Sequence, residues 1–158
     1  MVTTSDDAVV IERRIAARPE TVFSFFTDPE RYRRWQGVDA ELDPRPGGVF
    51  RVTMTGRSRT VTSGVFVVVD PPRRLVFTWG WETRDGLPEG MADVPAGAST
   101  VEVTLVPDGD GTILRLRHGG LLTAEACRFH QSGWDLTLDR LAVAATGGDP
   151  GPSPLDEL

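Results

Sequence analysis

The sequence contains no lysine and only one cysteine, Cys127. A single cysteine cannot form a disulfide within the chain, which fits a reducing compartment. Without lysine, a phosphate-binding loop of the Gly-Lys-Ser/Thr type is excluded, and Gly47-Gly48 is expected to be a hairpin connection instead. No apolar run approaches the roughly 18 residues of a transmembrane helix. The segment MVTTSDDAVV also lacks the features of a secretory signal, so the expected location is the cytoplasm.

Positive charge is scarce as well. The chain has 17 basic residues, all arginine, against 23 acidic ones, and its net charge is −6. Nucleic-acid binding needs clustered positive charge, so we expect neither a nucleic-acid nor a membrane partner. Two histidines and one cysteine match no zinc-binding spacing. We therefore expect no metal and no other cofactor.

A chain of 158 residues, of which 39% are hydrophobic, is long enough for one domain with its own core. Pro19 and the pair Asp28-Pro29 are helix-start signals, and they predict two short helices over about 19–26 and 29–35. Thr123 is expected to open a long helix that ends near Ala145. From Val38 onward the sequence has β-strand character and leads into the hairpin connection at Gly47-Gly48. Runs with strand character cover residues 8–16, 49–55, 60–69, 74–82, 99–106 and 112–118.

The strands follow one another through short turns, and the helices lie at the two ends of this order. This favours an α+β fold with a curved antiparallel sheet of about six to seven strands wrapped on the C-terminal helix. The domain is expected to span residues 8–146, with no element before it and a long loop over 83–98. Residues 147–158, rich in Pro and Gly, are expected to be a disordered tail that adds little to the core.

Five segments, taken together, resemble one known family. They are ERRIAARPETVFSFFTDPERYRRWQG, GGVFRVTM, VDPPRRLVFTWGW, GTILRLRHGGL and HQSGWDLTLDRL. They are similar to the bacterial single-domain relatives of Aha1, the activator of Hsp90 ATPase, within the SRPBCC or START/Bet v1-like superfamily. The resemblance covers about residues 8–146 and implies a helix-grip fold. That superfamily includes ligand carriers, cyclases, hydrolases and chaperone partners, so the resemblance alone does not assign a function.

Aromatic and histidine side chains are predicted to share inward faces. Trp79 and Trp81 alternate with outward residues on one strand, and His130 and Trp134 lie four apart on the long helix. In a helix-grip fold these faces look at the same space, and simple core packing is the alternative interpretation. The predicted ligand-binding residues are Phe50, Met54, Phe66, Trp79, Trp81, His118, His130 and Trp134. The two histidines are expected to exchange hydrogen bonds with the polar group of a mainly apolar ligand.

Catalytic residues are not assigned. A Ser-His pair would have to form from Ser63, Ser99 or Ser132, and no nucleophile elbow of the Gly-x-Ser-x-Gly type is present. Cys127 has no evident base and is expected to be an inert buried thiol. Glu82 is expected on the exposed strand face, where it could not act as an internal acid.

Three functions therefore stay open. The leading one is binding of a small hydrophobic molecule in an internal cavity between the sheet and the long helix. The first alternative, which rests on the resemblance, is a cochaperone-like module with an Hsp90 relative as its partner. The second alternative is an enzyme of the polyketide cyclase or hydrolase type. The sequence leaves the ligand and the oligomeric state open.

Overall fold

The computed structural model describes residues 2–5, 8–36, 39–54, 60–82 and 87–151. Residues 1, 6–7, 37–38, 55–59, 83–86 and 152–158 lie outside these ranges, among them the end of the strand predicted over 49–55 and parts of the predicted loop and tail. The helices and strands are β1 (Val2–Ser5), β2 (Ala8–Ile15), α1 (Pro19–Thr27), α2 (Pro29–Gln36), β3 (Asp39–Leu42), β4 (Val49–Met54), β5 (Thr60–Asp70), β6 (Arg74–Trp79), β7 (Ser99–Asp108), β8 (Gly111–Gly119) and α3 (Ala124–Ala145).

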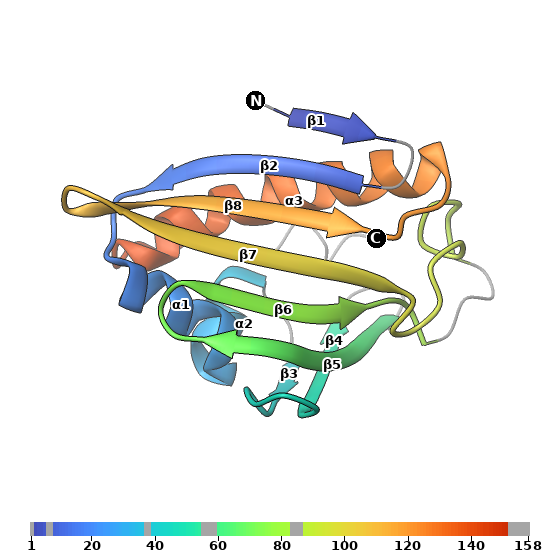
Figure 1. The fold of residues 1–158 in the computed structure, drawn as a ribbon, viewed down its shortest axis with the longest axis horizontal. Helices are drawn as coiled ribbons and strands as arrows, with labels where there is room; N and C mark the ends of the chain where they lie inside the picture. The colour runs from blue at the N-terminus through green and yellow to red at the C-terminus, as the bar shows by residue number, and fades with distance from the viewer. Residues whose placement is uncertain (1, 6–7, 37–38, 55–59, 83–86, 152–158) are drawn as a thin grey trace.

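The described strands form one antiparallel sheet in the order β1-β2-β8-β7-β6-β5-β4-β3. All three described helices lie behind the same face of this sheet, with α3 running along β2 and β8 (Figure 1). This confirms the predicted α+β architecture with a C-terminal helix against a curved sheet. The sheet has eight strands rather than six to seven because Val2–Ser5, expected to carry no element, pairs with β2.

Local capping explains where α2 and α3 begin. A carboxylate oxygen of Asp28 accepts hydrogen bonds from the amides of Glu30 at 2.9 Å and Arg31 at 3.3 Å. The hydroxyl of Thr123 accepts from the amide of Ala126 at 3.0 Å. Both side chains accept hydrogen bonds from amides of the first helical turn, which have no backbone partner within the helix, so these boundaries are fixed by local sequence.

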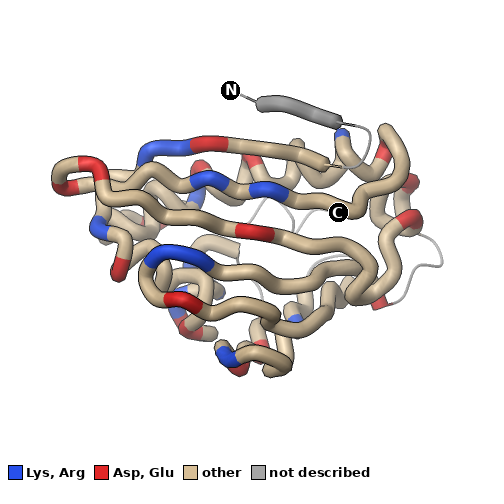
Figure 2. The backbone as a smooth tube through the Cα atoms, in the orientation of Figure 1, with Lys and Arg blue, Asp and Glu red and all other residues tan. Residues whose placement is uncertain are grey.

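The two faces of the sheet differ in chemistry. On β6, Leu75, Phe77 and Trp79 point into the core and are buried. Charged residues also lie along β6, β7 and β8 (Figure 2), and three exposed ones among them, Arg74, Arg115 and Arg117, alternate with buried residues and so point to the opposite face. On that face, Arg74 of β6 pairs with Glu102 of β7 at 2.7 Å. The buried core thus lies between the inner sheet face and the helices.

Residues 87–98 close one end of the core. The backbone amide of Trp81 donates to the carbonyl of Val94 at 2.8 Å, and the side chains of Met91 and Val94 are buried. Gly80 sits against this segment so tightly that a Cβ atom there would lie 1.7 Å from the carbonyl oxygen of Pro95. Only glycine permits that approach. Part of the predicted loop is therefore a packed component of the core.

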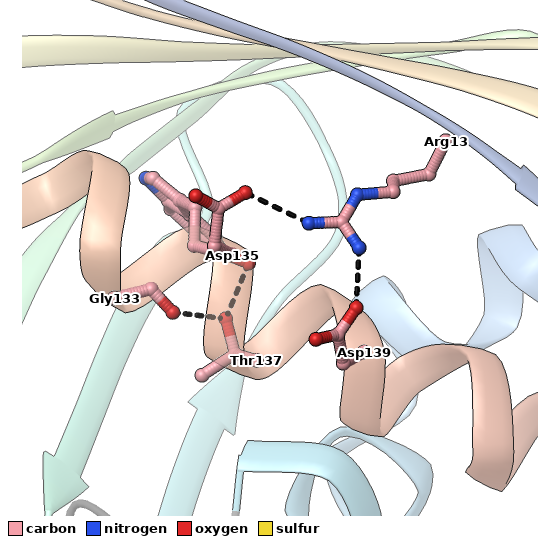
Figure 3. Close-up of polar contacts among 6 residues, drawn as sticks. Arg13, Gly133, Asp135, Thr137 and Asp139 are labelled. Carbon is pink, nitrogen blue, oxygen red and sulfur yellow. Dashed lines mark hydrogen bonds and ion pairs between the residues drawn. The ribbon is translucent and has the colours of Figure 1, made fainter. Parts of the chain in front are cut away.

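An ion-pair cluster holds α3 against β2. Arg13, on β2, pairs with Asp135 at 2.7 Å and also with Asp139, one helical turn further along (Figure 3). Inside α3, the hydroxyl of Thr137 donates to the carbonyl of Gly133 at 2.9 Å (Figure 3). Arg13 is partly exposed, so water screens its contribution to stability.

Another arginine, Arg140 of α3, is buried. The Arg140 guanidinium donates to the carbonyl of Trp35 at 2.7 Å, to that of Pro150 at 3.1 Å and to that of Gly151 at 3.0 Å. These contacts join α2, α3 and the first residues after α3. Residues 147–151 of the predicted tail therefore lie against the domain.

None of the helices in the described part of the chain has both the length and the hydropathy needed to cross a membrane.

The two arginines allow a matched test. Arg140→Met should lower the free energy of unfolding by about 2–3 kcal/mol, because the buried carbonyl of Trp35 loses a charged donor. Arg13→Met should lower it by less than about 1 kcal/mol, as is usual for exposed ion pairs. Urea unfolding of both variants beside the wild type measures the difference. Equal losses in the two variants would contradict the role assigned to Arg140.

Candidate functional site

The structure buries all eight residues that the sequence nominated. Their exposed fractions run from 0% for Phe50, Phe66 and His118 to 9% for Met54. They come from β4, β5, β6, β8, α3 and, for Trp81, the residues just after β6. The inward phase predicted for these strands and for the helix is therefore correct.

Trp79 lies at the centre of these side chains. Its ring centroid is 5.2 Å from that of Trp134, 5.7 Å from Trp81, 5.8 Å from His118 and 6.4 Å from His130. Its ring centroid also lies 5.9 Å from that of Phe50, which in turn lies 5.8 Å from that of Phe66. Edge and tilted contacts of this kind are favourable for aromatic pairs. We refer to the eight residues as the aromatic cluster; Met54 belongs to the same buried core without a ring contact.

Hydrogen bonds assign the proton of His118. The indole nitrogen Nε1 of Trp134 donates to His118 Nδ1 at 3.0 Å, so Nδ1 is unprotonated. The proton then sits on Nε2, which lies 2.8 Å from Oγ of Ser99. Ser99 accepts this bond and donates its own hydroxyl to the carbonyl of Trp79 at 2.7 Å. Every polar atom in this chain of contacts has a partner.

His130 is paired in the same manner with the opposite tautomer. Trp81 Nε1 donates to His130 Nε2 at 3.3 Å, and His130 Nδ1 donates to the carbonyl of Ala126 at 2.7 Å. The two imidazole rings lie 4.9 Å apart. Both histidines therefore have each ring nitrogen occupied by a protein group. This changes the role predicted for them, because neither ring nitrogen is left to bind a ligand.

Burial keeps both histidines neutral. It holds the pKa of His118 well below its ordinary value of 6.5, and the nearby His130 lowers that pKa further. Burial also lowers the pKa of His130 to about 4, although the hydrogen bond to the carbonyl of Ala126 acts in the opposite direction. A protonated ring would in addition meet an indole N–H where its acceptor nitrogen now lies.

The Ser99–His118 contact is the Ser-His pair that the sequence left open, but its polarity is reversed. A nucleophilic serine gives its proton to an unprotonated imidazole nitrogen. Here Nε2 carries the proton and the hydroxyl is directed to the carbonyl of Trp79. This arrangement supplies Ser99 with no base. Cys127, the other possible nucleophile, is buried near the start of α3 with its thiol 3.6 Å from the carbonyl of Leu121.

One polar atom of the cluster differs from the rest. Trp79 Nε1 is buried and has no hydrogen-bond partner among the residues that the structure describes.

Within the described part of the chain, no group of three His, Cys, Asp or Glu side chains is placed to hold a metal ion.

Sequence reasoning missed several residues around the cluster. Ser99 was named only as one of three possible serines, although it shares the inward face of β7 with Val101 and Val103 and strict alternation could have identified it as the internal one. Tyr32 of α2 is buried and its ring contacts Phe50 at 6.2 Å. Met91 could not have been found from periodicity because its segment has none.

Comparison with known proteins agrees with the fold. Residues 16–146 match the family described as "Activator of Hsp90 ATPase homolog 1-like protein". The chain belongs to this family. The Hsp90 ATPase activator homologue family was the one that the sequence segments resemble, and the sheet wrapped on α3 is its helix-grip fold.

Solved structures of other bacterial proteins are similar to this chain in fold. CalU16 from Micromonospora echinospora is 31% identical, with a TM-score of 0.67 over 89% of this chain and 76% of that one. Protein CV1439 from Chromobacterium violaceum is 23% identical, with a TM-score of 0.75 over 89% and 98%. A protein from Arthrobacter aurescens has a TM-score of 0.77 at 17% identity over 92% and 91%. The last two show the fold alone. A comparison with curated proteins finds no match.

Trp134 connects α3 to the sheet and should be among the most sensitive positions. Trp134→Ala removes a buried indole and the donor to His118, so we expect a loss of about 3–5 kcal/mol in the free energy of unfolding. Leu136→Ala, on the same helix but 48% exposed, should change it by less than about 0.5 kcal/mol. Chemical denaturation measures both, and a near-neutral Trp134→Ala would contradict the packing described above.

The lowered pKa values predict acid sensitivity. The unfolded chain takes up protons below pH 6.5 while folded His130 stays neutral to about pH 4, so stability is complete above pH 6.5 and falls as the pH decreases. Between pH 7 and pH 5 the uptake of a proton by His130 in the unfolded chain should lower the free energy of unfolding by about 2 kcal/mol. Urea unfolding at pH 7 and at pH 5 should show that the free energy of unfolding falls by about 2 kcal/mol less in His130→Gln than in the wild type. Carboxylates titrate alike in both proteins, so an identical pH dependence would contradict the assignment.

Proposed function

We propose that this protein binds a small, mainly apolar molecule between the inner face of the sheet and α3. The walls of that site are the other six residues of the aromatic cluster, and the two histidines position its tryptophans rather than contacting the ligand. The kind of ligand and the residues are those predicted from the sequence, but His118 and His130 no longer bond to the polar group of the ligand.

The observation that carries the proposal is the convergence of aromatic rings from separate elements on Trp79. Strands β4, β6 and β8 and helix α3 each direct a large ring to this one place, with centroid distances of 5.2–5.9 Å for Phe50, His118 and Trp134. Ligand sites for small molecules are lined by such surfaces with few polar groups. The uncharged state of both histidines further favours an apolar ligand over an ionic one, because a buried charge needs a partner.

The neutral dye Nile red tests the proposal. It should bind the native protein and quench tryptophan emission, and Met54→Trp, which adds bulk within the cluster, should weaken binding more than about tenfold. The matched control is Val65→Thr, because Val65 is 43% exposed on β5 opposite Val49. It should leave binding unchanged. Near-ultraviolet circular dichroism verifies that each variant keeps its native packing.

The opposite pattern would overturn the proposal. If Val65→Thr weakens binding and Met54→Trp does not, the dye lies on the exposed valines of the outer sheet face. Native mass spectrometry of the purified protein is an independent measurement, and a retained apolar molecule is the expected result.

A cochaperone-like role is the second candidate, and the family description favours it. Such a module would act through its surface on an Hsp90 relative. Adding the protein to a purified Hsp90-type ATPase and measuring ATP hydrolysis separates the two functions. Stimulation that survives Met54→Trp would support the cochaperone role, whereas no stimulation leaves ligand binding as the better account.

A further inference from the structure

The indole N–H of Trp79 is an unused donor at the centre of the aromatic cluster. The residue is 4% exposed, and Nε1 finds no acceptor among the described residues. Buried N–H groups are nearly always paired, and an unpaired one is unfavourable. The position of this atom, surrounded by rings from the sheet and from α3, therefore calls for an acceptor.

The neighbouring side chains cannot supply that acceptor. His118 Nδ1 already accepts from Trp134, and His130 Nε2 already accepts from Trp81. Ser99 accepts from His118 and gives its proton to the carbonyl of Trp79 itself. The remaining ring neighbours, such as Phe50, have no polar atom. All the acceptor nitrogens of the cluster are thus engaged, and a donor is left over.

We propose that Trp79 Nε1 donates a hydrogen bond to a neutral carbonyl oxygen of the bound molecule. This inference rests on the proposed binding function and specifies its ligand as an apolar compound with a ketone, ester or quinone carbonyl. A carbonyl brings an acceptor and no donor, so it satisfies Trp79 and makes no new demand on the paired groups.

Charge argues for a neutral oxygen rather than a carboxylate. Within the cluster the titratable groups are His118 and His130, and both are uncharged. The arginines of β2 and α3 that the core approaches are already engaged, Arg13 with Asp135 and Asp139, and Arg140 with backbone carbonyls. A carboxylate placed beside Trp79 would lack a cation, which buried anions require.

Two probes of the same shape test this. 2-Acetylnaphthalene and 2-ethylnaphthalene share a ring and a two-carbon substituent and differ by the carbonyl oxygen. Trp79→Phe should weaken the ketone about fivefold more than the hydrocarbon, the usual effect of one lost hydrogen bond. Trp81→Phe is the matched control, because its indole N–H already serves His130. It should alter the affinity for both probes equally.

Nuclear magnetic resonance gives a readout independent of affinity. The chain has four tryptophans, so four indole N–H signals are expected, and the one missing in Trp79→Phe identifies Trp79. This signal should move downfield with 2-acetylnaphthalene and much less with 2-ethylnaphthalene. The indole signals of Trp81 and Trp134 should show no such difference between the probes.

The outcomes separate this inference from the binding function. One outcome overturns the carbonyl assignment and leaves the binding function standing. In it both probes bind, Trp79→Phe does not change the ratio of their two affinities, and the Trp79 signal does not distinguish them. If Trp81→Phe changes the ratio instead, the donor is assigned to the wrong tryptophan. If neither probe binds the native protein, the binding function fails and this inference fails with it.

Discussion

A buried imidazole needs a partner for each ring nitrogen, and this requirement determines how the interior of the protein is arranged. Indole N–H groups meet it: Trp134 of α3 donates to His118 of β8, and Trp81 donates to His130 of α3. Each bond crosses from the sheet side to the helix. The hydrogen bonds that pair the histidines therefore also fix how α3 lies on the sheet, and both imidazole rings lie next to the ring of Trp79, at centroid distances of 5.8 and 6.4 Å.

The same bonds limit the chemistry available inside. Trp134 fixes the tautomer of His118, and this tautomer makes the imidazole a donor toward Ser99. A contact that would suggest a hydrolase by distance alone is thus paired in the wrong direction for proton abstraction. With both rings neutral, the proposed binding function calls for an uncharged ligand.

Much of this could be predicted from the sequence, and the reasons are local. Asp28 and Thr123 mark helix starts because capping depends on neighbouring residues only. Alternation placed Phe50 and Trp79 on inward faces. Hydrogen-bond partners such as Trp134 with His118 could not be predicted, because they depend on the distances between elements remote in sequence. The pairing of β1 was missed because its residues, VTTS, contain one apolar side chain and show no alternation of apolar and polar positions.

Trp81 takes part in contacts of two different kinds. Its backbone amide is bonded to Val94 in the segment that closes one end of the core, and its indole is bonded to His130 of α3. A molecule that enters by displacing that segment must break the first bond, and one that enters by lifting the helix must break the second. The exchange rates of the two hydrogens of this one residue therefore distinguish the routes of entry.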